Sequence, residues 1–148
     1  MAVVLRITAG VTVDAGQEQS WRLLVDWSRQ REWIWATRTS GGHGTGALVS
    51  ARTGIGPVGF TDVMKIIEWD PPRRCSVRHT GAVVRGHGIF EVRSLGGRSE
   101  VRWTEFVVLP VRLPASFERL VLAAIAPVAR AGLGSSLARF ARLLPAGG

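Results

Sequence analysis

The C-terminal stretch from Pro114 to Leu144 constrains the fold most strongly, because no other segment is long enough to form a helix that spans a whole domain. A proline suits the first turn of a helix, where its missing N–H is not needed. Apolar side chains then recur at the three-and-four spacing of one helical face: Phe117, Leu120, Val121, Ala124, Val128 and Ala131. We therefore expect a long helix that covers the apolar face of a sheet.

Two features interrupt this helical pattern. Pro127 lies inside it and removes a backbone hydrogen bond, and Gly132 and Gly134 follow closely. Beyond them, apolar residues such as Leu137 and Phe140 point roughly 160° away from the first apolar face, at about 100° per residue. These features predict a kink near the proline and a break or register change at the two glycines. The alternative is that the last turns bind a second surface, such as a dimer partner.

The chain before this helix alternates polar and apolar residues in short runs that are separated by turn residues. The first run, Val3–Val13, precedes two short helices, one that begins at Asp14 and one over Arg29–Trp33. Asp14 and Gln17 have the spacing of a capping box for the first helix. Six further strands are expected, at Ala36–Ser40, Ala47–Thr53, Phe60–Trp69, Cys75–Thr80, Val83–Val92 and Ser99–Leu109.

Short turns between consecutive strands predict an antiparallel meander, in which the first strand pairs with the last. The length of 148 residues fits one domain over residues 1–148, with a loose tail at Pro145–Gly148. The fold class is therefore α+β.

The basic charge of the chain does not indicate a nucleic-acid site. Its 19 basic residues exceed its 11 acidic ones by eight, and all but Lys65 are arginines spread along the sequence. Proteins that bind nucleic acid instead concentrate such residues in one stripe. We expect no nucleic-acid partner, and a monomer or a homodimer.

Membrane insertion and cofactor chemistry are also not expected. Leu120–Val128 is too short to cross a bilayer, and Met1–Leu5 does not resemble a signal peptide. A lone cysteine, Cys75, suits a reducing cytoplasm, which is the expected location. The three histidines lie far apart, and no nucleotide-binding or nucleophile motif is present, so neither a metal nor a cofactor is predicted.

Several short motifs occur in a familiar order. They are Val11–Asp14 before a helix with Trp21 and Asp26, Trp33 at the end of the second helix, the segment Ile67–Arg74, and the strand Val101–Phe106. Their spacing resembles the START-like (SRPBCC) superfamily, in its polyketide cyclase/dehydrase and lipid-transport branch. The resemblance implies the helix-grip fold, a curved antiparallel sheet of about seven strands wrapped around a long C-terminal helix, with two short helices after the first strand.

The resemblance also implies an apolar cavity between the sheet and the long helix, which would bind a small hydrophobic molecule, an aromatic or polycyclic one included. Candidate wall residues are Trp27, Trp33, Trp35, Phe60, Met64, Val77, Phe90, Trp103, Leu120 and Ala124. Plain core packing is an equal alternative for Trp33 and Trp35. In the strand Phe60–Trp69 alternation leaves two inward sets open, Phe60 with Met64 and Ile66, or Val63 with Ile67 and Trp69.

Glu105 and His79 are the candidate catalytic residues. Arg102 should face water, so alternation turns Trp103 and Glu105 inward, where burial would raise the pKa of the carboxyl and suit proton transfer. The alternatives are an ion pair between Glu105 and an arginine such as Arg52 or Arg85, exposure of Glu105, and a purely hydrogen-bonded His79. The function is then ligand binding, a cofactor-free cyclase or dehydratase, or a partner module that uses the last helix. The absence of tyrosine removes any cyclase mechanism based on a tyrosine hydroxyl.

Overall fold

The computed structural model describes residues 3–82, 84–109 and 113–144. The tail expected to be loose, and Val83 at the start of an expected strand, lie outside these residues. Along the chain the elements are β1 (Val3–Val13), α1 (Gln17–Leu24), the 3-10 helix η1 (Trp27–Glu32), β2 (Thr37–Gly41), β3 (Leu48–Ile55), β4 (Val58–Asp70), β5 (Arg74–His79), β6 (Gly86–Leu95), β7 (Arg98–Leu109) and α2 (Ala115–Arg142).

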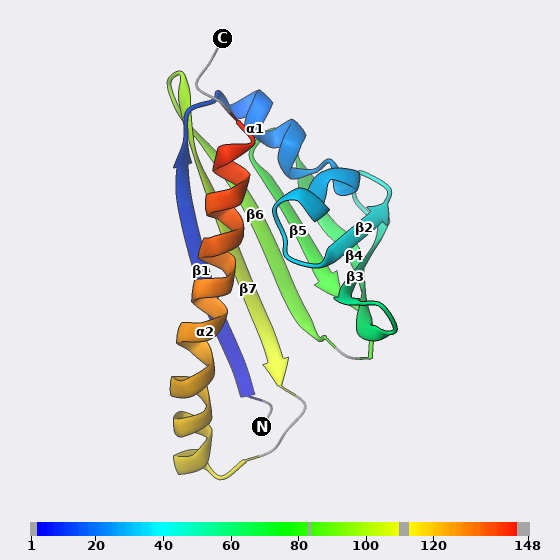
Figure 1. Ribbon diagram of the computed structural model, residues 1–148, viewed down its shortest axis with the longest axis vertical. Coiled ribbons are helices and arrows are strands. Elements are labelled where there is room, and N and C mark those ends of the chain that lie inside the picture. The colour runs from blue at the N-terminus through cyan, green and yellow to red at the C-terminus, as the bar shows by residue number, and fades with distance from the viewer. Residues whose placement is uncertain (1–2, 83, 110–112, 145–148) are drawn as a thin grey trace.

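The seven strands form one antiparallel sheet in the order β1-β7-β6-β5-β4-β3-β2. Strands β2 to β7 follow one another as a meander, and β1 pairs along its length with β7, from Val3 opposite Leu109 to Val13 opposite Ser99. The two short helices and α2 lie on one side of this sheet (Figure 1). The predicted α+β helix-grip architecture is confirmed.

The capping box predicted for the first helix is wrong. Helix α1 begins at Gln17, and Gly16 precedes it without a side-chain cap. Asp14 instead accepts a hydrogen bond of 2.6 Å from Arg98, and the Gln17 amide donates to the backbone oxygen of Val92 at 3.0 Å. Both side chains therefore tie the start of the helix to the β6–β7 end of the sheet.

A β-bulge in β4 resolves which of its faces points inward. Ile66 lies opposite Val77, but the next pair in the register is Glu68 with Ser76, so Ile67 is an extra residue. An extra residue reverses the alternation beyond it. Ile66 and Trp69 consequently both point into the core. Ile66 comes from the first inward set considered from the sequence and Trp69 from the second, so each set is right for one part of the strand.

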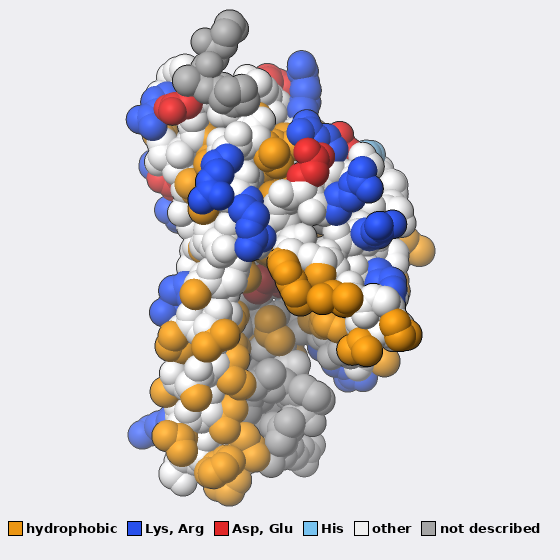
Figure 2. Space-filling view, in the orientation of Figure 1, with side chains coloured by type: hydrophobic (Ala, Val, Ile, Leu, Met, Phe, Trp, Pro, Cys, Tyr) orange, Lys and Arg blue, Asp and Glu red, His pale blue; other side chains and the backbone are white. Residues whose placement is uncertain are grey.

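Helix α2 runs without interruption from Ala115 to Arg142, through Pro127 and both glycines. The predicted break at the glycines is therefore wrong. The side of the helix expected to cover the sheet is wrong too, because Leu120 and Val128 are 65% and 73% exposed. Figure 2 shows apolar side chains gathered along the lower part of α2.

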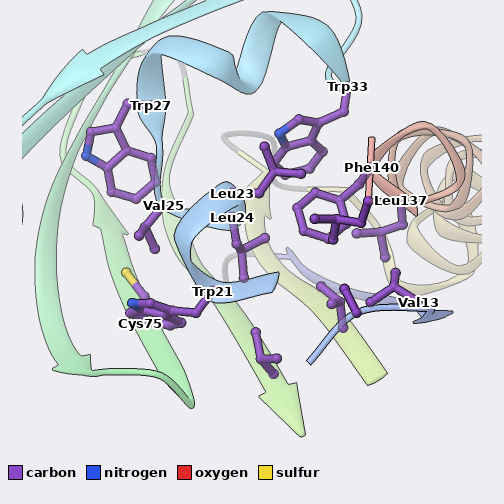
Figure 3. Packing of buried hydrophobic residues seen from close by; sticks show 14 of the residues in the cluster. Val13, Trp21, Leu23, Leu24, Val25, Trp27, Trp33, Cys75, Leu137 and Phe140 are labelled. Carbon is purple, nitrogen blue, oxygen red and sulfur yellow. The ribbon is translucent and has the colours of Figure 1, made fainter. Parts of the chain in front are cut away.

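The last turns of α2 hold the helix to the rest of the protein. Leu137 and Phe140 are fully buried, and the Phe140 ring lies 5.2 Å from that of Trp33 in an edge-to-face contact. Figure 3 shows both residues facing Trp33 and Leu24. Leu24 is the last residue of α1, and Trp33 directly follows η1. By length and hydropathy alone α2 also qualifies as a membrane span, and only 11% of its apolar window is buried.

Candidate functional site

The inner face of the sheet contains a cavity of about 200 Å³. Its walls come from η1, from the segment that follows η1, and from every strand between β2 and β7. The wall residues with aromatic or aliphatic side chains are Trp27, Ile34, Val49, Ala51, Phe60, Met64, Val77, Val84, Ile89, Phe90 and Trp103. Six of the ten predicted ligand-binding residues are among them: Trp27, Phe60, Met64, Val77, Phe90 and Trp103.

The cavity does not lie against the long helix. Leu120 and Ala124 are exposed and do not line it, and no other described residue of α2 lines it either. Trp35 is 64% exposed and also lies outside the wall. The wall of the cavity opposite the sheet is instead formed by η1 and Ile34. Helix α2 does not contribute to this wall, because only its C-terminal turns reach the core.

Trp33 belongs to the core and not to the cavity wall. It is fully buried and contacts the rings of Phe90 and Trp103, both of which do line the cavity, at 6.0 and 5.9 Å. It therefore supports the wall from behind. Its Nε1 is the one fully buried side-chain nitrogen or oxygen in the described part of the chain that has no hydrogen-bond partner.

Three titratable side chains form a hydrogen-bonded chain in this predominantly apolar wall. His79 Nδ1 lies 2.9 Å from Asp62 Oδ1, and His79 Nε2 lies 3.0 Å from Glu105 Oε2. Trp103 Nε1 donates to the other oxygen, Glu105 Oε1, at 2.8 Å. The side chains of His79, Asp62 and Glu105 are 5%, 15% and 14% exposed. We call these three residues the acidic triad.

The backbone brings the acidic triad together from three strands. Asp62 comes from β4, His79 from the end of β5 and Glu105 from β7, while Gly88 of β6 lies between the last two strands. A Cβ atom at Gly88 would lie 2.8 Å from Glu105 Oε1. Glycine thus provides the space in which the glutamate side chain crosses β6 to reach the histidine.

The two carboxylates determine the charge of His79. Burial alone lowers the pKa of an imidazole, but the hydrogen bonds to Asp62 and Glu105 and their negative charges outweigh it and raise the pKa of His79 to about 9. At neutral pH the ring is therefore a cation that donates both N–H groups. It is not available as a general base there, which agrees with the hydrogen-bonded alternative considered for this residue.

The partners of Glu105 point to an acceptor role. Both of its oxygens accept hydrogen bonds, one from the His79 ring and one from the Trp103 indole. A carboxyl group held in this position suits proton transfer. Glu105 pairs with His79, and no ion pair of Glu105 with an arginine is found among the described residues, so the arginine pair expected as an alternative is wrong. Arg52 donates to the backbone oxygen of Gly56 instead.

Asp62 is the member of the acidic triad that sequence reasoning missed. It is two residues from both Phe60 and Met64, so strand alternation places all three on one face. That signal was available once the Phe60–Met64 face was chosen. Gln30 was missed as well: it is buried in the wall and accepts a hydrogen bond of 2.7 Å from Thr39. Within the described ranges, no group of three His, Cys, Asp or Glu residues is arranged to hold a metal ion.

Comparisons with known proteins agree with this architecture. The sequence profile of a family described as polyketide cyclase / dehydrase and lipid transport matches residues 4–145. No curated protein matches the chain. Its fold is similar to that of the protein TTHA0849 from Thermus thermophilus, with a TM-score of 0.74 and 15% identity over 94% of this chain and 96% of the other.

Two further solved structures share the fold. The Zhui aromatase/cyclase from Streptomyces sp. R1128 has a TM-score of 0.67 and 18% identity, over 98% of this chain and 99% of the other. DynU16, a protein in the dynemicin biosynthetic locus, has a TM-score of 0.69 and 20% identity, over 94% of this chain and 46% of the other.

Proposed function

The chain belongs to the polyketide cyclase / dehydrase and lipid transport family, and from that premise we propose that it binds a small hydrophobic, ring-containing molecule in the cavity beneath η1. The observation that carries the proposal is the cavity itself. A dry apolar cavity of roughly 150 Å³ is enough to admit benzene, and this one measures about 200 Å³. A ligand of one or two rings therefore matches its size.

The wall supports a flat aromatic ligand in particular. Phe90 and Trp103 have ring centroids 5.3 Å apart at 60°, and both rings line the cavity together with Trp27. Aromatic pairs with offset or tilted rings are favourable beyond the area they bury. Burial of the ligand's apolar surface, at about 25 cal/mol per Å², would supply most of the affinity.

A titration with 2-methylnaphthalene, followed by tryptophan fluorescence, tests the proposal. Val77 lines the cavity, so Val77→Phe fills part of it and should weaken binding at least tenfold. Val58 is 76% exposed, and Val58→Phe is the matched control that should bind like the wild-type protein. Circular dichroism and thermal unfolding establish that both variants are folded. Equal affinity of Val77→Phe and wild type would refute binding in this cavity.

The acidic triad supports a second candidate function, a cofactor-free cyclase or dehydratase. Glu105 would remove a proton from a bound substrate, and the hydrogen bond of 3.0 Å between His79 and Glu105 would hold the carboxylate in position. The solved fold relatives include an aromatase/cyclase. If the protein turns over a substrate, Glu105→Gln should abolish the reaction and leave binding of 2-methylnaphthalene intact. Unchanged turnover would remove Glu105 from the mechanism.

A partner module based on the last turns of α2 has less support. Leu137 and Phe140 are fully buried within the chain itself, so they cannot contact a partner. The exposed apolar residues lie at the opposite end of the helix. Light scattering at high protein concentration would distinguish a monomer from an assembly formed through that end.

A further inference from the structure

The cavity wall carries more acidic than basic side chains. Its charged residues are Asp62, His79 and Glu105, and no arginine or lysine of the described chain lines it. Two carboxylates against one imidazole leave the acidic triad with a net negative charge, whether or not the imidazole is protonated. The cavity is thus locally acidic, although the whole chain carries a formal charge of +8.

The acidic triad also has unused acceptor capacity. Two carboxylates offer about eight lone-pair positions. The described contacts are with His79, which lies near both carboxylates, and with the Trp103 indole, which donates to Glu105. His79 has no donor left for a ligand, because each ring nitrogen faces a carboxylate. Of the neutral polar side chains in the wall, Thr37 and Thr53 bond to each other at 2.9 Å, and Gln30 accepts from Thr39.

Aromatic faces border this acceptor-rich position. Trp103 carries its indole N–H on Glu105, and its ring lies beside Phe90 and lines the same cavity. A cation next to such rings is attracted by their π-electrons as well as by the carboxylates. A buried carboxylate in the ligand would instead face like charge without a matching donor, which is strongly unfavourable.

From these observations we propose that the cavity selects ring-containing molecules that carry an amine, and disfavours the same rings carrying a carboxylate. The inference rests on the proposed function, since it specifies the class of molecule that occupies the same cavity. The ammonium group would lie at Asp62 and Glu105, and the rings would lie against Trp103 and Phe90. No step of chemistry is implied.

A matched series of probes tests the charge preference on the wild-type protein. The series is 2-methylnaphthalene, 2-naphthylmethylamine, 2-naphthylmethanol and 2-naphthoate, titrated at neutral pH and physiological salt. We expect the amine to bind at least tenfold more tightly than 2-naphthoate, with the alcohol between them. Attraction to the overall positive charge of the protein would give the opposite order, so non-specific binding cannot mimic the expected result.

Charge-removing variants then assign the preference to the acidic triad. Glu105→Gln should reduce the ratio of amine to 2-naphthoate affinity, and the double variant Asp62→Asn/Glu105→Gln should abolish the preference for the amine, because burial lowers the pKa of His79 once both carboxylates are gone and leaves the ring neutral. Glu91, half-buried on the outer face of β6 and paired with Arg74 at 3.3 Å, provides the control. Glu91→Gln should leave the ratio unchanged.

The outcomes separate this inference from the proposed function. If 2-methylnaphthalene binds but the amine is no tighter than 2-naphthoate, the charge preference is wrong and apolar binding stands. If none of the four probes binds, the proposed function fails. Should the double variant not fold, by circular dichroism and thermal unfolding, the order of affinities on the wild-type protein and on Glu105→Gln still decides the inference.

Discussion

The pairing of His79 with two carboxylates predicts that the protein loses stability as the pH rises from neutral to alkaline. The pKa of His79 is about 9 in the folded protein, against 6.5 for an unperturbed histidine. One pKa unit corresponds to about 1.4 kcal/mol, so protonated His79 contributes about 3 kcal/mol to the free energy of unfolding. Because the folded-state pKa is the higher of the two, this contribution is complete below pH 6.5 and is lost as the pH rises through about 9.

Denaturant unfolding followed by tryptophan fluorescence between about pH 6.5 and pH 9 measures this loss. We expect the free energy of unfolding to fall by more than about 2 kcal/mol across that window. Cys75 interferes little, because burial raises the pKa of its thiol from 9.0 to about 12, and the resulting loss of stability falls mainly above pH 9.

Two histidine variants complete the experiment. His79→Gln removes the titrating group and should flatten the dependence on pH. His87 is exposed on the outer face of β6, so His87→Gln should keep the wild-type slope. A wild-type protein whose stability does not change over the window, or a His79→Gln variant with an undiminished slope, would refute the electrostatic account of the acidic triad.

Three further perturbations have expected outcomes. Gly88→Ala places a methyl group against the side chain of Glu105 and should lower the free energy of unfolding by about 1–3 kcal/mol. Gly97→Ala has open space around it and should change the free energy of unfolding little. An equally small change for both variants would mean that the Glu105 carboxylate has room to move. Leu137→Ala in the buried end of α2 should cost about 2–5 kcal/mol, and Leu120→Ala in its exposed end less than about 0.5 kcal/mol; the reverse order in thermal unfolding would contradict the packing of this helix. The buried Cys75 thiol should resist a thiol reagent at pH 8 until denaturant is added, and rapid modification of the native protein would count against its burial.

The sheet and its inner face were predictable because strand alternation is a local property. Arg102 has to face water, which directs Trp103 and Glu105 inward, and the structure places both in the cavity wall. The turn signals between strands likewise predicted the meander of β2 to β7. Each of these inferences depends on neighbours within a few residues along the chain.

The acidic triad required information that alternation does not contain. Asp62 and His79 are 17 residues apart, and His79 and Glu105 are 26 residues apart. Their contact depends on the register of β4 against β5, and of β6 against both β5 and β7. The bulge at Ile67 shifts one of these registers, and a single inserted residue in a strand has no clear sequence signal.

The long helix shows a different limit. Apolar spacing in α2 identified two faces correctly, but spacing does not say which face meets the sheet. The turns with Leu137 and Phe140 are covered by the two short helices and the end of β1, and the earlier turns are not. The capping prediction failed for a related reason, since Arg98, distant in sequence, competes for the side chain of Asp14.

The location of a bound ring within the protein tests the central claim most directly. In an NMR titration with 2-methylnaphthalene, intermolecular nuclear Overhauser effects to the methyl groups of Val49, Met64 and Val77 are expected, because these groups line the cavity. Leu120 and Val128, exposed on α2, should show none. Effects confined to those two helix residues, or their absence throughout the protein at saturating probe, would contradict a ligand-binding cavity beneath η1.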